Sequence, residues 1–189
     1  EHKRVNFVGD EVLYRNLSNS PSKLESIFQI VKHTDKHLEE DARTVILTDF
    51  IRKEFLNFKG RETSVLNKLG VLPIFKYILA KQVGKTSLGV LTGSLVIIHE
   101  TALNQLRELL TNENLTNAKA VTQLFAEGVI KTLVGTKAFL GEGWDAPCIN
   151  TLVLASYVGS FVSSNQMRGR AIRVDANNLD KTGSIWHLA

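Results

Sequence analysis

The chain has 189 residues, of which 43% are hydrophobic and 22% are charged. This length and composition suit one globular domain with a substantial core and exclude a disordered chain. The formal net charge of +4 is compatible with a nucleic-acid partner but is too small to indicate one, since an ordinary protein surface explains it equally well.

Cysteine and histidine usage narrows the possible sites. The single cysteine, Cys148, excludes an intrachain disulfide framework and favours a reducing cytoplasm. His33 and His37 have a spacing that suits zinc, but no third ligand accompanies them, so we expect a solvated helix face and no metal site. No signal peptide or bilayer-length apolar run is present, so we expect no membrane partner.

The first predicted element is a helix. Residues 1–21 have little periodicity apart from a short strand-like stretch around 12–14, and we expect them to be a leading segment before a domain at 22–189. Ser20-Pro21-Ser22 is a helix start signal with a capping serine. Apolar residues at helical spacing follow and predict a helix from Ser22 to about Glu40.

Short apolar runs then alternate with helical patterns. We expect strands at 44–48, 87–91, 132–136 and 151–155, and helices at 73–79, 101–110 and 117–126. The charged stretch 50–67 is either an insertion or a helix carrying a surface loop. This alternation predicts an α/β fold with a parallel sheet covered by helices on both faces. Gly93, Thr136 and the loop after Leu154 should meet at the carboxyl edge, where ligands gather.

Gly84-Lys85-Thr86 resembles the end of a P-loop. A P-loop also requires a glycine five residues before Gly84, and that position is Leu79 within a helical pattern. The chain is therefore expected to lack a P-loop of its own.

The most informative pattern is Q-x-x-G-R-x-x-R at Gln166, Gly169, Arg170 and Arg173. Arginines three apart share a helix face, so both guanidinium groups are expected to point at one anion. Gly169 removes a side chain where the backbone has to approach something closely. Taken alone, the pattern is better explained as a solvated helix face.

The surrounding segments strengthen the pattern. The strand at 132–136 leads into a loop containing Gly-Glu-Gly-Trp-Asp, and the strand at 151–155 precedes the arginine segment. This order resembles motifs V and VI of superfamily-2 helicases and translocases. Residues 43–49 resemble the motif IV strand of that family, 88–94 the strand and turn that follow it, and 125–128 the helix end before motif V. The Gly-Glu-Gly-Trp-Asp loop and the glutamine that opens the second motif look most like those of the DEAD/DEAH-type restriction-enzyme "Res subunit" branch.

The resemblance implies a RecA-like domain of the P-loop NTPase class, namely the second helicase domain. ATP and Mg²⁺ would then be bound by a missing N-terminal RecA-like domain of the same chain, and we expect the present chain to be an excised fragment. By resemblance, Arg173 is the arginine finger, Arg170 its partner on the γ-phosphate, and Gln166 orients the network. Gly143, Asp145 and Gly169 approach the nucleotide, with Asp145 either contacting the ribose or supporting a residue that contacts the nucleotide. A helix or turn cap is the alternative for Asp145.

The resemblance also implies contacts with a nucleic-acid backbone, with DNA favoured over RNA. The residues expected to make them end strands or begin turns: Thr48, Gly93, Ser94, Thr136 and Lys137. Lys137 replaces an aspartate common in one large branch of the family. Trp144 is expected to pack in the core rather than to stack on a base.

By this resemblance, we expect the C-terminal motor domain of an ATP-dependent helicase or translocase, inactive as an isolated fragment. One alternative is a helicase-like scaffold that binds nucleic acid without turnover. Another is a Rossmann enzyme that uses Gly141-Glu142-Gly143 as a dinucleotide turn.

Overall fold

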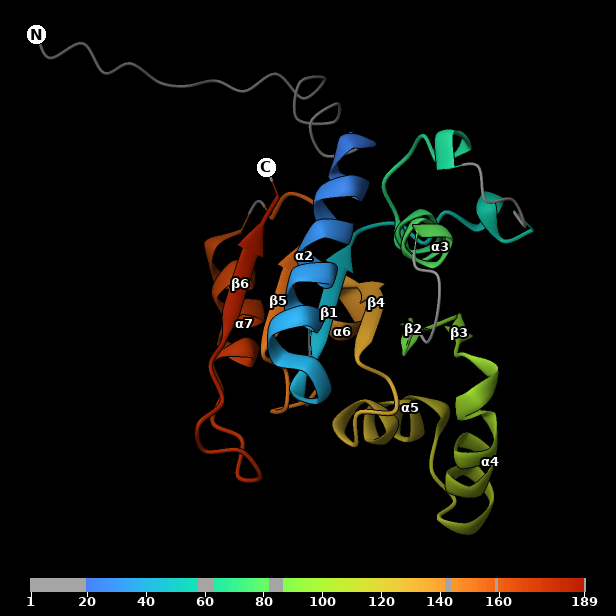
Figure 1. The fold of residues 1–189 in the computed structure, drawn as a ribbon, viewed down its shortest axis with the longest axis vertical. Coiled ribbons are helices and arrows are strands. Elements are labelled where there is room, and N and C mark those ends of the chain that lie inside the picture. Colours follow the sequence, from blue (N-terminus) through green and yellow to red (C-terminus); the bar gives the residue numbers. More distant parts are fainter. Residues whose placement is uncertain (1–19, 58–62, 82–86, 142–143, 159, 189) are drawn as a thin grey trace, which may run out of the picture.

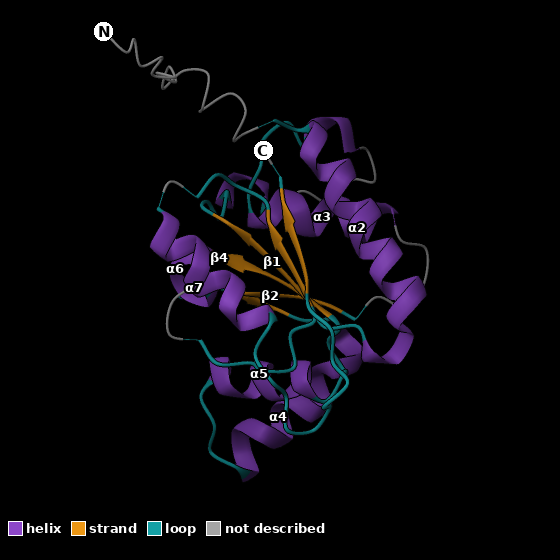
Figure 2. Ribbon diagram, turned by 90° about the vertical axis from the view of Figure 1, so that its left-hand side faces the viewer, coloured by secondary structure: helices purple, strands orange, loops and turns teal. Residues whose placement is uncertain are grey.

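The computed structural model describes residues 20–57, 63–81, 87–141, 144–158 and 160–188. In this part of the chain, a six-stranded sheet lies between two layers of helices (Figures 1 and 2). The predicted strand at 12–14, nearly all of the leading segment and the Gly84-Lys85-Thr86 stretch lie outside the described residues.

The sheet has the strand order β3-β2-β4-β1-β5-β6. Five strands run parallel: β1 (Thr44–Thr48), β2 (Leu88–Leu91), β4 (Thr132–Thr136), β5 (Thr151–Leu154) and β6 (Ser184–His187). The short edge strand β3 (Val96–Ile97) is antiparallel to β2. The predicted fold class is confirmed, and the wholly parallel sheet is corrected at this edge.

Two layers of helices cover the sheet (Figure 2). Helices α2 (Ser22–Leu38) and α3 (Val71–Lys81) pack on one face. The other face carries α4 (Leu103–Asn112), α5 (Asn117–Ala126), α6 (Lys137–Leu140) and α7 (Phe161–Ala171). Alternation along β1 explains the two cores, because Val45 and Leu47 face the α4–α7 layer whereas Ile46 faces α2 and α3.

The start of α2 differs from its prediction. Pro21 occupies the capping position and makes no side-chain hydrogen bond to the helix, so the predicted serine cap is wrong. Among the described residues, none of the helices combines the length and apolar character needed to cross a bilayer.

The stretch 50–67 is not a helix in its described part. It contains two short 3₁₀ turns, Lys53–Phe55 and Thr63–Val65, whose apolar anchors are the buried Phe55 and Leu66. The Val71 amide donates to the Phe50 carbonyl at 2.8 Å, which ties the start of this excursion to α3. The described part of the stretch therefore forms an irregular excursion between β1 and α3 and not the helix of the second alternative.

Candidate functional site

The carboxyl ends of the central strands bring several predicted residues together. Thr48 and Thr136 are register partners at the ends of β1 and β4. The Gly93–Ser94 turn follows β2, and the Thr92 hydroxyl accepts hydrogen bonds from the Ser94 and Leu95 amides at 3.3 and 2.9 Å. A Cβ added to Gly93 would lie 3.5 Å from the Phe139 ring, so this turn adjoins α6, the helix that starts at Lys137.

Exposure separates these residues. Gly93 and Ser94 are exposed and Thr136 is half-buried, but Thr48 is only 1% exposed. The Thr48 hydroxyl does not reach the surface, so its expected phosphate contact does not fit the structure.

Lys137 is held by two acceptors. Its ammonium lies 2.6 Å from an Asp49 carboxylate oxygen and donates to the Tyr157 carbonyl at 2.6 Å. Asp49 therefore offsets the positive charge that the sequence pattern places at this edge. The sequence analysis predicted neither partner. Asp49 could have been found, because it directly follows the strand that ends at Thr48. The Tyr157 carbonyl could not, because a backbone acceptor leaves no signal in the sequence.

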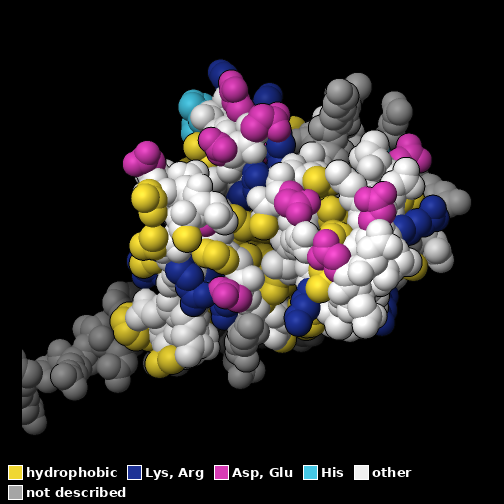
Figure 3. All heavy atoms as spheres, turned by 90° about the horizontal axis from the view of Figure 1, so that it is seen from below, with side chains coloured by type: hydrophobic (Ala, Val, Ile, Leu, Met, Phe, Trp, Pro, Cys, Tyr) yellow, Lys and Arg dark blue, Asp and Glu magenta, His cyan; other side chains and the backbone are white. Residues whose placement is uncertain are grey.

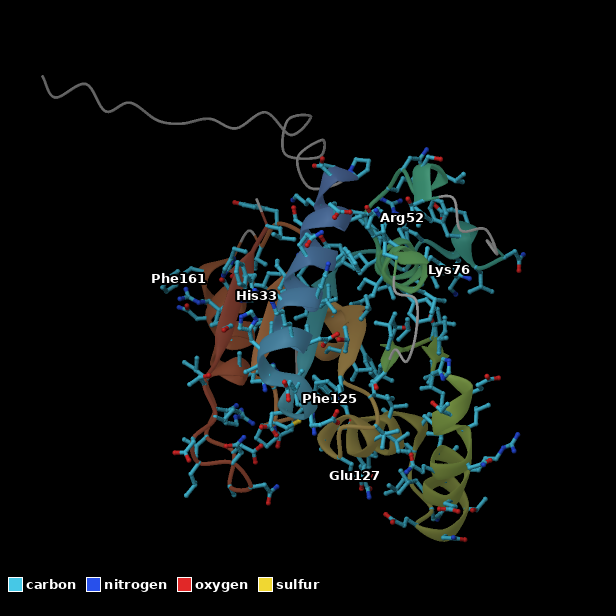
Figure 4. All side chains as sticks on the ribbon, in the orientation of Figure 1. His33, Arg52, Lys76, Phe125, Glu127 and Phe161 are labelled. Atoms are coloured by element: carbon cyan, nitrogen blue, oxygen red, sulfur yellow. The ribbon has the colours of Figure 1, made fainter. Side chains whose placement is uncertain are left out.

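The neighbouring end of α7 is apolar and exposed. Phe161 and Val162 are 79% and 64% exposed, and Figure 4 shows Phe161 pointing away from the sheet. Tyr157, whose carbonyl binds Lys137, is 56% exposed. Aromatic side chains thus adjoin the polar strand ends.

The arginines do not share a helix face as predicted. Helix α7 ends at Ala171, so Arg173 lies beyond it. Arg170 donates from Nη1 to the Trp144 carbonyl and from Nη2 to the Gly141 carbonyl, the latter at 3.2 Å. Arg173 forms an ion pair with the Asp145 carboxylate. Both guanidinium groups are turned toward the loop between α6 and β5, because carbonyl and carboxylate oxygens of that loop lie within their reach.

The remaining residues predicted for the nucleotide site are either exposed to solvent, free of close neighbours, or outside the described residues. Gln166 is exposed on α7. A Cβ added to Gly169 would meet nothing within 4 Å, so the expected close approach to the backbone is not made within the described chain. Gly143 lies outside the described residues.

Trp144 packs in the core, as predicted. It is 9% exposed, its Nε1 donates to the Thr122 hydroxyl at 2.8 Å, and its ring centroid lies 6.0 Å from that of Phe125. Gly141 ends the short helix α6 rather than opening a helix directly after a strand. The dinucleotide-turn alternative is therefore wrong, since that motif needs the glycines at the strand-to-helix junction.

A cavity of about 520 Å³ lies beside Asp145. Its walls come from α5 and from residues 144–148, with Asp175 and Asn177 at one side. Burial raises the pKa of the Cys148 thiol in this cavity to about 11, so the thiol stays protonated at neutral pH and is a poor nucleophile. Figure 3 views the molecule from the α4 and α5 side, where acidic, basic and apolar side chains are mixed.

The histidine pair lies on exposed helix surface. The rings of His33 and His37 are 4.0 Å apart, and the His37 ring bonds the His33 carbonyl at 2.8 Å. In the described ranges, no group of three or more His, Cys, Asp or Glu side chains is arranged to hold a metal ion.

Comparison with known proteins identifies the fold. No family model matches the chain, and no curated protein sequence matches it significantly. The C-terminal part of the Fun30 ATPase domain superposes with a TM-score of 0.50 at 13% identity, over 87% of this chain and 39% of that one. This likeness, together with the strand order, shows a RecA-like α/β fold.

Two further solved structures are similar. The Hef helicase domain from Pyrococcus furiosus gives a TM-score of 0.49 at 17% identity, over 87% of this chain and 25% of that one. Domain 2 of the DEAD-box helicase Mss116p, bound to an RNA duplex, gives 0.47 at 15% identity, over 88% and 50%. The chain spans between a quarter and a half of the length of these three solved chains.

Proposed function

We propose that this chain is the C-terminal motor domain of an ATP-dependent superfamily-2 helicase or translocase, comprising residues 22–189. It would supply Arg173 to ATP bound on an N-terminal RecA-like domain and contact a nucleic-acid backbone. The observation that carries this proposal is the Arg173–Asp145 pair. Its side chains are 51% and 71% exposed, and it joins the segment resembling motif V to the segment resembling motif VI.

The surroundings of this pair suit a triphosphate. An exposed guanidinium donates bidentately to phosphate oxygens, and the backbone at Gly169 is open to an approaching ligand. Arg170 already donates to two loop carbonyls, so we assign it to holding the loop and assign the γ-phosphate contact to Arg173. Gln166, exposed on α7, would orient the nucleotide network.

Mg²⁺ needs carboxylate oxygens, and we assign its ligands to the N-terminal domain. The Asp145 carboxylate accepts from Arg173, and the described residues hold no cluster of three metal-ligating side chains. When bound, MgATP supplies the phosphoryl group that is transferred to water. The residues of this chain position the phosphates and stabilise their charge.

The nucleic-acid strand is assigned to the carboxyl edge of the sheet. Gly93, Ser94 and Thr136 offer backbone amides and hydroxyls of the kind that contact phosphates, and Lys137 adds a cation balanced by Asp49. The exposed rings of Tyr157 and Phe161 suit stacking with unpaired bases. The preference for DNA and the assignment to the Res subunit branch rest on the sequence resemblance.

The test uses the full-length protein that includes the upstream domain. Arg173→Ala should lower nucleic-acid-stimulated ATP hydrolysis by about 10³-fold or more, with ATP binding largely retained, because an arginine finger acts on the transition state. Arg173→Lys should not restore turnover, since one ammonium does not reproduce the planar fork. Phosphate release and nucleotide titration measure these quantities.

Arg168→Ala is the matched control. Arg168 is exposed on α7, five residues before Arg173, and occupies a variable position of the pattern, so its loss should leave turnover within about twofold. Normal turnover in Arg173→Ala would contradict the arginine assignment. Strong nucleic-acid binding by a wild-type protein that hydrolyses no ATP would favour the non-catalytic scaffold instead.

A further inference from the structure

Lys181 lies between α7 and β6, in a polar segment to which the sequence patterns assign no role. Its ammonium donates to the carbonyls of Pro147 at 2.6 Å, Ile149 at 2.8 Å and Ala171 at 3.3 Å. An ammonium group has three N–H donors, so these three carbonyls use all of them. Lys181 is therefore built to hold backbone and leaves no donor for a phosphate.

The three carbonyls belong to the two segments that form the proposed nucleotide site. Pro147 lies two residues after Asp145, in the loop before β5. Ala171 is the last residue of α7 and lies two residues before Arg173, at a helix end where a cation is favourable. One ammonium thus fixes the backbone next to both members of the Arg173–Asp145 pair.

The ion pair itself is too exposed to fix these segments. Exposed ion pairs contribute little to stability, and both side chains of this pair are more than half exposed. Arg170 holds the same loop upstream of Asp145, at Gly141 and Trp144. Lys181 holds it downstream, so Asp145 lies between two anchoring cations.

The segment carrying Lys181 packs closely on α7. A Cβ added to Gly183 would lie 2.6 Å from the Ala171 carbonyl oxygen, so this approach requires glycine. Burial lowers the pKa of Lys181 from its ordinary value, and the nearby Asp175 carboxylate opposes that shift. Asp175 is itself 7% exposed, and one of its oxygens accepts from the Asn177 amide at 3.0 Å.

We propose that Lys181 is a positioning residue of the arginine site, which sets the Asp145 loop against the end of α7 and thereby aims Arg173. This inference rests on the proposed motor function. A displacement of about 1 Å in a catalytic group can cost up to about 10²-fold in rate. Loss of Lys181 should therefore lower kcat while leaving KM for ATP nearly unchanged, since ATP is bound mainly by the other domain.

The first experiment needs no catalytic activity. Replacement of Trp186 by Phe leaves Trp144 as the single tryptophan, and its carbonyl and ring lie in the loop that Lys181 holds. In that background, Lys181→Met should raise acrylamide quenching of Trp144 by about twofold or more, because the loop loses two hydrogen bonds and its tie to the end of α7. Lys32→Met, at an exposed position of α2 on the other face of the sheet, should leave quenching unchanged.

The second experiment measures ATP hydrolysis by the full-length protein below the unfolding temperature of every variant. Lys181→Met should lower kcat by about tenfold or more with KM within about threefold, and should add little further loss in the Arg173→Ala background. Lys181→Arg, which keeps the charge and several donors, should recover part of the rate.

The outcomes separate the two proposals. Unchanged quenching in Lys181→Met, or an equal loss of kcat with and without Arg173, would overturn the positioning role. If the wild-type protein has no ATPase activity while Lys181→Met still shows the predicted rise in quenching, the motor function and the catalytic part of this inference are both wrong. The structural tie made by Lys181 would then remain.

Discussion

The carboxyl-edge group (Gly93, Ser94, Thr136 and Lys137) and the arginine group (Asp145, Arg170 and Arg173) are positioned by different means. Strand register brings the backbone of the first group to one edge, because adjacent parallel strands end side by side. Bonds from cationic side chains to loop oxygens fix the second. A regular sheet places residues by periodicity alone, whereas irregular loops need specific long side chains to hold them in place.

The largest expected effect tests how tightly the sheet is packed beneath the carboxyl-edge group. A Cβ added to Gly135 would lie 2.6 Å from the Leu91 carbonyl oxygen on the neighbouring strand. Gly135→Ala should lower the free energy of unfolding by about 1–3 kcal/mol, since the backbone has to shift. Urea denaturation of the chain measures this change.

Gly169→Ala is the contrasting change beside the arginine group, one residue before Arg170. The added methyl group would meet nothing within 4 Å, and alanine is more stable than glycine in a helix interior. The free energy of unfolding should therefore rise by about 0.5–1 kcal/mol. Equal destabilisation by both substitutions would show that the two regions are packed alike. A more stable Gly169→Ala protein with reduced ATPase would indicate that bound nucleotide approaches this position.

The second prediction separates two arginines three residues apart. Arg170→Ala leaves two loop carbonyls without their charged donor and should cost about 1–3 kcal/mol. Arg173→Ala removes an exposed ion pair and should cost about 0–1 kcal/mol. Thermal and urea denaturation of the two variants compare the costs. A larger cost for Arg173→Ala would reverse the structural and functional roles that we assign.

The same contrast explains which parts of the fold can be predicted from the sequence. The strands at 44–48 and 132–136 are predicted to the residue, because uniform apolar runs bounded by polar residues define buried strands. The edge strand β6 was missed because three of its four residues are exposed, so it has no buried run. Edge pairing depends on the neighbouring strand rather than on local pattern.

The site could be predicted less well than the fold. The glutamine, glycine and arginine pattern identified the arginine segment, but side-chain spacing did not reveal where each guanidinium points. Arg170 and Lys181 bind carbonyl groups, and every residue has a carbonyl, so no residue type marks the acceptor. The Lys137–Asp49 pair was missed for a different reason, since it joins the ends of two strands that are distant in sequence.

The smallest expected effect concerns the charge balance of the carboxyl-edge group. The Asp49 side chain is 37% exposed and pairs with Lys137. Its negative charge repels a phosphate, and the ion pair neutralises the Lys137 ammonium that would attract one. Asp49→Asn should strengthen binding of a single-stranded oligonucleotide about two- to fivefold at low salt and steepen the salt dependence of binding. Glu127→Gln makes the same change in net charge at the end of α5 (Figure 4), away from the carboxyl edge, and should change affinity by less than about twofold. Fluorescence anisotropy over a range of salt concentrations measures both variants.

In the Lys137→Ala background the gain from Asp49→Asn should shrink, since the cation that it releases is absent. Equal gains from Asp49→Asn and Glu127→Gln would mean that overall charge, rather than this edge of the sheet, governs binding.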